Sequence, residues 1–302
     1  MQKNKMKLLF GICCILSLGL ITPIHAGETG HYKGVIRGIK AATLPPPGFY
    51  YVAYNVYYNS DTSMNQHGDE KNIGFDLNSV ALSNRLVWIT NQKILGADFG
   101  MNMVIPLVNT DIEIDAFNVQ DEQSGIGDVF VESFLGWHEA RYDATIAVGL
   151  YMPTGDYDVH EPASLGKDFW TAMLSLGGTY YFDSKKLWSL SILGRYETHS
   201  EKDSVDVKPG DDFGFEWGLA NAVTPTIDMG VTGYAHWQVS DDSGSAATWD
   251  TDVHDQVFSI GPEVKIFIPS ITSFVTVRFR KEFGAEDRAE GQMLTLSLAK
   301  RF

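Results

Sequence analysis

The sequence has little cysteine, little positive charge and no long apolar run after its first few residues. Only two of the 302 residues are cysteines, Cys13 and Cys14, which excludes a disulfide framework or a thiolate metal site in the rest of the chain. Lys and Arg number 23 against 38 Asp and Glu, so the formal charge of −15 argues against a nucleic-acid partner. After residue 26, no 18-residue window is uniformly apolar, which excludes membrane-spanning helices.

The first 26 residues have the order of a secretory signal peptide. Lys3, Lys5 and Lys7 come first, the apolar run Leu8–Ile21 follows, and a small residue, Ala26, stands at the expected cleavage site. The alternative, a membrane anchor, needs about 20 apolar residues, and this run is shorter. We therefore predict a signal peptide at residues 1–26 and a mature chain without cysteine.

The rest of the chain alternates between apolar and polar residues with a period of two. At the C-terminus Leu294, Leu296 and Leu298 share one face, and Thr295 and Ser297 share the other. Such alternation over 10 to 14 residues is typical of tilted membrane strands. The pattern predicts twelve strands at Gly48–Asn59, Phe75–Thr90, Lys93–Val108, Gly125–Arg141, Tyr142–Pro153, Asp168–Phe182, Lys186–His199, Asp212–Thr224, Thr226–Ser240, Asp255–Ile268, Ile271–Phe283 and Glu290–Phe302.

The connections between these strands alternate in length. Tight turns such as Asn91–Gln92 and Pro269–Ser270 alternate with long loops, which we place at Ser60–Gly74, Asn109–Ser124, Thr154–Lys167, Ser200–Asp211, Asp241–His254 and Gly284–Ala289. Short turns at one end and long loops at the other indicate an outer-membrane barrel, whereas a soluble sandwich or jelly roll has no reason to alternate them. The predicted fold is all-β: a transmembrane antiparallel up-and-down β-barrel of about 12 strands over residues 48–302. Long loops are expected outside the cell and both termini in the periplasm.

Aromatic residues near the strand ends suit the two membrane interfaces. We predict outward-facing girdles of Trp88, Trp137, Trp170, Trp188, Trp237, Tyr50, Tyr58, Tyr180 and Phe302. The expected partners are therefore outer-membrane lipid and lipopolysaccharide. Phe302, last on an alternating strand, resembles the terminal signature read by the barrel-assembly machinery, although Lys300 stands where that signature has an apolar residue.

The polar faces of the strands carry charges of both signs. The lumen and constriction candidates are Arg85, Asp98, Glu132, Arg195, Glu197, Glu216, Glu263, Lys265, Arg278, Arg280 and Glu282. One interpretation is a ladder of cross-strand salt bridges that stiffens a solvated lumen. The other is a charged constriction that selects permeants, with Arg278 and Arg280 pointing the same way toward an anionic group.

Aromatic side chains also occupy predicted inward positions. These are Tyr51, Phe130, Phe134, Tyr151, Tyr181 and Tyr234. In a narrow lumen they either fill space or line a path for apolar solutes. Residues 27–47, which precede the first strand, form either a plug inside the barrel or a loose periplasmic tail.

Catalysis and metal binding find little support in the sequence. The histidines of the mature chain are scattered, no paired-histidine metal spacing occurs, and no serine stands in a nucleophile motif. The acidic loops fit no calcium-loop pattern and are expected to form a solvated outer surface. We expect no enzymatic activity, no catalytic residue, no metal and no cofactor.

Several short motifs resemble one outer-membrane family, the "MetA-pathway of phenol degradation" family. They are Leu44–Gly48, Gly125–Asp128, Pro153–Asp158, Pro209–Phe213 and His236–Gly244, in that order along nearly the whole mature chain. The resemblance implies an outer-membrane protein that helps small hydrophobic or aromatic compounds cross, comparable in proposed role to FadL-type transporters. Two other classes stay open: an outer-membrane enzyme acting on lipid or peptide, and a structural or adhesive barrel without conduction.

Overall fold

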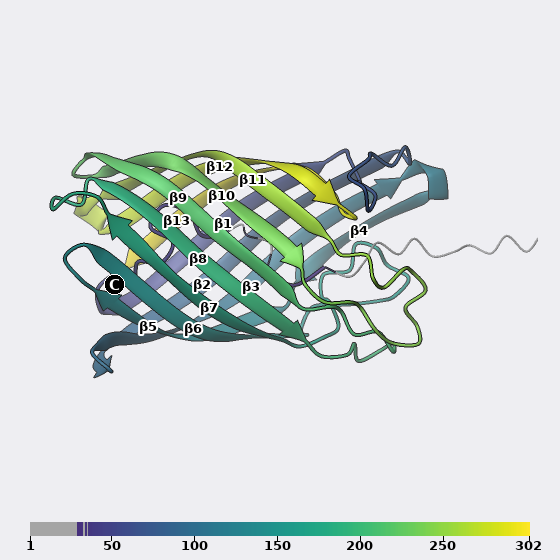
Figure 1. The fold of residues 1–302 in the computed structure, drawn as a ribbon, viewed down its shortest axis with the longest axis horizontal. Coiled ribbons are helices and arrows are strands. Elements are labelled where there is room, and N and C mark those ends of the chain that lie inside the picture. Colours follow the sequence, from purple (N-terminus) through teal and green to yellow (C-terminus); the bar gives the residue numbers. More distant parts are fainter. Residues whose placement is uncertain (1–28, 33, 35) are drawn as a thin grey trace, which may run out of the picture.

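The computed structural model describes residues 29–302 except 33 and 35, and shows a closed antiparallel β-barrel (Figure 1). The predicted signal peptide lies outside the described residues. Among the described residues, no helix is long and apolar enough to cross a membrane. The predicted fold class is confirmed, because β1 pairs with β13 on one side and with β2 on the other, which closes the sheet into a ring.

The strands follow one another around the barrel in sequence order. They are β1 (Gly48–Ser60), β2 (Phe75–Ile94), β3 (Ala97–Ile114), β4 (Val119–Ile126), β5 (Val129–His138), β6 (Tyr142–Met152), β7 (Thr171–Tyr181), β8 (Trp188–His199), β9 (Asp212–Thr224), β10 (Ile227–Gln238), β11 (Gln256–Ile268), β12 (Ser273–Glu286) and β13 (Gln292–Arg301). Closure leaves no sheet edge, so the backbone polar groups are paired within the ring as a bilayer requires.

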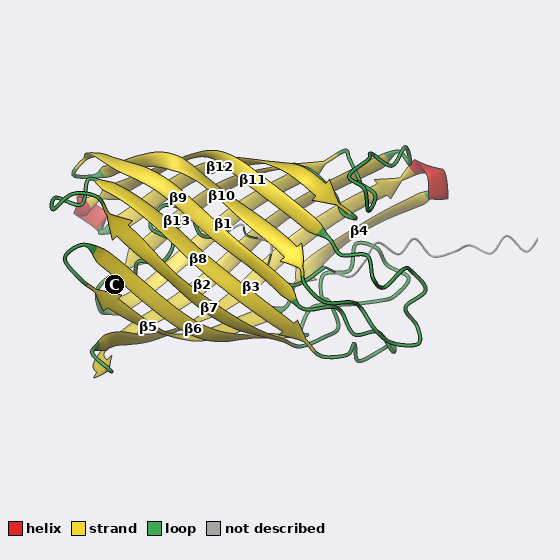
Figure 2. Cartoon of the chain, in the orientation of Figure 1, coloured by secondary structure: helices red, strands yellow, loops and turns green. Residues whose placement is uncertain are grey.

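β4 and β5 share one position in the barrel, which makes twelve positions in all. The C-terminal part of β3, from Leu107 to Ile114, pairs with β4. Its N-terminal part, from Asp98 to Val104, pairs with β5. The loop that we predicted at Asn109–Ser124 is wrong: β3, a short 3-10 turn η1 (Asp115–Phe117) and β4 form a hairpin that projects past the other strands (Figure 2). Acidic residues such as Asp111 and Glu113 suggested a loop, but they lie exposed on a strand.

The two ends of the barrel differ as the connection lengths predicted. Tight turns lie at one end with the C-terminus, and we call this the short-turn end; the opposite end carries the long connections and is the long-loop end (Figure 1). At the turn between β7 and β8, Asp183 accepts hydrogen bonds from the backbone N–H groups of Trp188, Leu187 and Lys185. These bonds hold the pKa of the Asp183 carboxyl below its usual range.

The outer face of the barrel is a belt of exposed apolar side chains. Leu174, Leu176 and Val148 are typical members, and Trp88, Trp170, Trp188, Tyr180 and Phe302 are exposed as the girdle prediction requires. Such a surface is stable only against lipid. A shallow apolar hollow of about 670 Å³ interrupts it over β1, β2, β3, β5 and β6.

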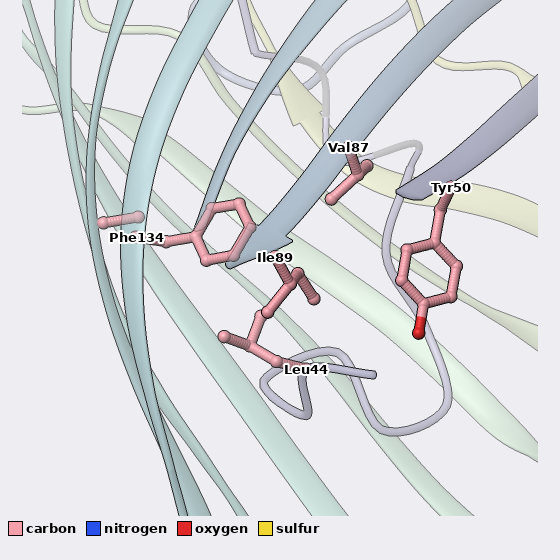
Figure 3. Close-up of a cluster of buried hydrophobic side chains, with 6 residues drawn as sticks. Leu44, Tyr50, Val87, Ile89 and Phe134 are labelled. Carbon is pink, nitrogen blue, oxygen red and sulfur yellow. The ribbon is translucent and has the colours of Figure 1, made fainter. Parts of the chain in front are cut away.

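The faces of β1 are the reverse of those predicted. Tyr50 is buried in a cluster with Leu44, Val87, Ile89 and Phe134 (Figure 3). Tyr58 likewise faces inward, where its hydroxyl donates to Glu282, so neither tyrosine belongs to an outer girdle.

Tyr51 lies on the opposite face of β1 from Tyr50, so it is not a lumen residue. Its hydroxyl donates to Asn84 on the neighbouring strand. The alternation on β1 was misleading because tyrosines occupy both of its faces.

A charge placed in the middle of the apolar belt is expected to destabilise the barrel. Leu296 lies exposed in the middle of β13, and an arginine at the bilayer midplane costs about 2–4 kcal/mol. Urea unfolding in lipid vesicles should show this loss for Leu296→Arg. Leu95→Arg, in the exposed turn between β2 and β3, is the matched control and should unfold like the parent. Equal stability of both variants would mean that Leu296 does not face hydrocarbon.

Candidate functional site

The described part of the N-terminal segment, residues 29–47 without 33 and 35, lies inside the barrel. Its backbone N–H groups donate to inward-facing side chains of the wall: His31 and Tyr32 to Glu197 on β8, Arg37 to Glu216 on β9, Ile39 to Glu263 on β11, and Ala42 to Ser191 on β8. These N–H···O distances are 3.0–3.3 Å. An irregular backbone at membrane depth is tolerated where protein surrounds it, as here.

The segment runs from one end of the lumen to the other. His31 contacts Thr171, the first residue of β7, at the long-loop end. Thr43 donates to Asp143, near the start of β6, at the short-turn end. The first described residues therefore lie at the end opposite to the one where β1 begins.

Arg280 on β12 is the strongest link between wall and segment. Its side chain is completely buried, and its guanidinium donates to the carbonyl oxygens of Gly34 and Arg37, the latter at 2.7 Å. A third contact, 3.5 Å long, joins it to Glu216. Charge-assisted bonds of this kind are stronger than neutral ones, so Arg280 fixes the middle of the segment.

Arg278 and Glu263 form a directly opposed cross-strand ion pair. The Arg278 Nε–Glu263 Oε2 distance is 2.6 Å, and the two residues are register partners on β12 and β11. Gly38 of the segment packs directly on this pair, since a Cβ at that position would overlap both side chains. A side chain at position 38 would therefore push the segment off the wall.

Arg195 and Glu216 both contact Tyr32 of the segment. The Arg195 guanidinium lies 3.9 Å from the ring centroid, and the Tyr32 hydroxyl donates to Glu216 at 2.7 Å. Arg195 also pairs with Glu216 at 3.1 Å. Both the charged and the aromatic parts of the lumen thus contact the N-terminal segment.

The other predicted lumen charges are placed as follows. Arg85 pairs with Glu132 at 3.4 Å, and Asp98 pairs with Lys93 near the short-turn end. Lys265 is half-buried, with its ammonium 4.8 Å from the centroid of the Phe274 ring. Glu282 accepts from the hydroxyls of Tyr58 and Tyr234.

Five of the six predicted lumen aromatics face inward, and most of them contact the segment. Tyr151 stacks on the His31 ring at 4.7 Å and packs at a tilt against Phe130 at 4.3 Å. Tyr234 packs against Gly34, whose φ of +62° favours glycine. The other two are Tyr181, whose hydroxyl donates to Asp143, and Phe134, packed near Leu44.

A chain of buried histidines and acids at the long-loop end could not be foreseen from the sequence. We call it the histidine–carboxylate chain, and its links run Asp128–His31 (2.9 Å), His31–Thr171 (2.7 Å), Thr171–His199 (2.7 Å), His199–Asp212 (3.0 Å), Asp212–His236 (3.2 Å), His236–Asp255 (3.4 Å) and Asp255–Arg288 (3.1 Å). It joins residues from several strands or their flanks and from the N-terminal segment.

Four of the five motifs that carry the family resemblance meet at this chain. Asp128 accepts from the backbone N–H groups of Thr154, Gly155 and Lys167, which joins two of the motifs. Asp242 accepts from the N–H of Gly210, which joins two more. The motif residues were visible in the sequence, but only the fold shows that they build one structure.

A small cavity lies in the lumen beside the segment. A cavity of about 20 Å³, room for one water molecule, lies between side chains of the wall and the segment. Its lining comprises Tyr32, Ile36, Arg37, Arg85, Phe130, Glu132, Tyr151, Met173 and Arg195. The N-terminal segment thus packs against wall side chains within the lumen.

The closed ring, the apolar belt and the polar interior together define an outer-membrane β-barrel. The chain belongs to the family described as "Putative MetA-pathway of phenol degradation", whose model matches residues 60–298. This confirms the resemblance seen in the motifs. None of the curated proteins compared with the chain matches it.

Solved structures with the same fold share little sequence with the chain. The COG4313 outer membrane channel from Pseudomonas putida F1 is 17% identical, with a TM-score of 0.78 over 87% of this chain and 98% of that one. The translocator domain of autotransporter NalP from Neisseria meningitidis is 9% identical, with a TM-score of 0.50 over 85% of this chain and 90% of that one. The transport unit of autotransporter AIDA-I from Escherichia coli is also 9% identical, with a TM-score of 0.50 over 85% and 91%.

Proposed function

We propose that this protein is an outer-membrane channel for small hydrophobic or aromatic compounds and that residues 29–47 are its plug. The observation that carries the proposal is the double hydrogen bond from the buried Arg280 to the segment backbone. The name of the family, which refers to phenol degradation, supports an aromatic solute. The similar Pseudomonas putida protein is described as an outer membrane channel, which supports conduction.

The lining of the lumen fits a solute with an aromatic ring. The Tyr151 ring stacks on the His31 ring and packs at a tilt against Phe130 at the long-loop end. Displacing the upper part of the plug would free the Tyr151 face that His31 covers, and aromatic rings stack favourably on such faces. Charged pairs such as Glu263 with Arg278 would then border an opened path.

The orientation in the membrane follows from the two ends of the barrel. We propose that the long loops face the outside and that the C-terminal end of β13 faces the periplasm, as in bacterial barrels with short periplasmic turns. Phe302, 77% exposed after the last strand, is then available to the barrel-assembly machinery. Lipid and lipopolysaccharide would cover the apolar belt. We infer a transport role without catalysis.

Uptake of a labelled aromatic compound tests the channel proposal directly. A strain lacking this protein is expected to take up phenol or a larger monoaromatic more slowly at micromolar concentrations, and the wild-type chain should restore the rate. Purified protein in liposomes should pass the same solute without chemical change. Unchanged uptake in the deletion strain would exclude the transport role, and product formation in the liposomes would favour the enzyme alternative.

A further inference from the structure

In the middle of the histidine–carboxylate chain, two neutral imidazole rings carry too few N–H hydrogens for the contacts that they make. His31 Nε2 faces the Asp128 carboxylate, and His199 Nε2 faces the Asp212 carboxylate. Both Nδ1 atoms contact the single hydroxyl of Thr171 at 2.7 Å. A hydroxyl donates only one hydrogen, so one of the two Nδ1 atoms must donate to it.

Two neutral histidines do not satisfy this arrangement. The two carboxylate contacts and one hydroxyl contact need three ring hydrogens, whereas two neutral imidazoles carry two. These contacts therefore need either one further proton, on a ring nitrogen or on a carboxyl oxygen, or a metal ion in place of one hydrogen. A metal ion at His199 Nε2 leaves Nδ1–H to donate to Thr171, and Thr171 to donate to His31.

Three buried side chains converge at that position. Glu197, His199 and Asp212 each offer a ligand atom, and these atoms all lie within 4.8 Å of one another. All three residues are at least 96% buried. Within the part of the chain that the structure describes, Glu197 Oε1 and Asp212 Oδ1 make no hydrogen bond. Glu197 Oε1 is thus a buried carboxylate oxygen without a partner among the described residues, which is costly and which a bound cation would relieve, whereas Asp212 Oδ1 has the His236 ring 3.2 Å away.

Each candidate ligand also has a second contact that orients its side chain, as metal ligands usually have. Thr171 contacts the rear nitrogen of His199. Two backbone N–H groups of the N-terminal segment donate to Glu197 Oε2, which leaves Oε1 available. His236 lies 3.2 Å from Asp212 Oδ1.

We propose that Glu197, His199 and Asp212 bind one divalent transition-metal ion, with Zn²⁺ as the expected ion. Zn²⁺ holds nitrogen and carboxylate ligands at about 2.0–2.2 Å, so ligand atoms of one ion lie roughly 3–3.5 Å apart. His199 Nε2 and Asp212 Oδ2 are 3.0 Å apart. An imidazole with two carboxylates suits zinc better than calcium, which prefers oxygen ligands alone. This site does not depend on the channel proposal.

Calorimetric titration of the full mature chain with Zn²⁺, in detergent after chelator treatment, tests the site. The parent should bind one equivalent, and His199→Ala and Glu197→Gln should each weaken binding at least about 100-fold, while Thr171→Val should weaken it about 10- to 100-fold. His254→Ala is the matched control, since His254 forms an exposed pair with Asp241 at the same end of the barrel. It should bind like the parent.

The heat-modifiable gel shift establishes that each variant still folds, and zinc X-ray absorption of the parent should show one nitrogen with oxygen ligands. Absence of zinc binding by folded parent protein would overturn the proposal and leave the missing hydrogen to a proton. Binding that survives in His199→Ala, or that is lost equally in His254→Ala, would also overturn it. Thr171→Val keeps the three ligands, so its intermediate effect separates a coordinated ion from a misfolded barrel.

Discussion

Replacing Arg280 by methionine is expected to open the channel. Methionine keeps most of the side-chain volume but removes the donors to Gly34 and Arg37. Hydrogen bonds to charged groups contribute about 1.5–3 kcal/mol each, so the loss of two of them corresponds to a shift of roughly 100-fold or more toward a displaced plug. Arg195 still neutralises Glu216 in this variant, so no unpaired charge remains to destabilise the barrel.

Single-channel recording in planar bilayers measures this shift as open probability, and liposome uptake of an aromatic solute measures its consequence. Lys281→Met is the matched control, because Lys281 is the next residue on β12 and its side chain is exposed on the other face. Arg280→Met with wild-type open probability and a normal gel shift would show that the segment does not close the lumen.

A disulfide between the plug and the wall is expected to abolish transport. A Cβ placed on Gly30 lies 2.9 Å from Cγ of Asp212, so cysteines at both positions bring the sulfur of residue 212 within reach of an S–S bond of about 2 Å. A disulfide stabilises the ordered arrangement by about 2–4 kcal/mol, so uptake by oxidised Gly30→Cys/Asp212→Cys should fall at least about tenfold.

The chemistry of this test is clean because the only natural cysteines are Cys13 and Cys14, within the predicted signal peptide. Reductant should restore uptake to the level of the two single variants, which serve as controls. If the oxidised and reduced double variants transport equally, solutes do not need the plug to move. Mass spectrometry of the intact protein verifies that the disulfide has formed.

Much of the barrel was predictable because the membrane imposes a simple rule on each strand. Leu294, Leu296 and Leu298 face lipid and alternate with buried Thr295 and Ser297, so β13 appears plainly in the sequence. The rule fails where both faces of a strand accept the same residue type. On β1 tyrosine suits an interface girdle as well as a packed lumen. The prediction therefore placed Tyr50 outward and Tyr51 inward, which is the reverse of the structure.

The rule also says nothing about strands outside the bilayer. The β3–β4 hairpin projects into water, where Asp111 and Glu113 are as acceptable as apolar residues. Its alternation therefore carries no hydrophobic signal. The acidic residues and the length of the stretch suggested a loop there.

The candidate site was only half visible in the sequence. Arg278 and Arg280 could be placed on the inner face, but the partner of Arg280 is the backbone of a segment without periodicity. The histidine–carboxylate chain joins residues as distant as His31 and Asp255, and no local spacing links them. Long-range contacts of this kind depend on the register of the whole ring.

The path of the N-terminal segment constrains the order in which the barrel assembles. β1 and β13 are the first and last strands of the sequence, and their pairing completes the ring. Threading the segment through the lumen afterwards would need the paired charges around Glu263 and Glu216 to separate. The segment must therefore bind to the inner face of the sheet before the sheet closes into a barrel. Variants that loosen the segment should for this reason also slow insertion, and accumulate as unclosed sheets before any effect on transport is seen.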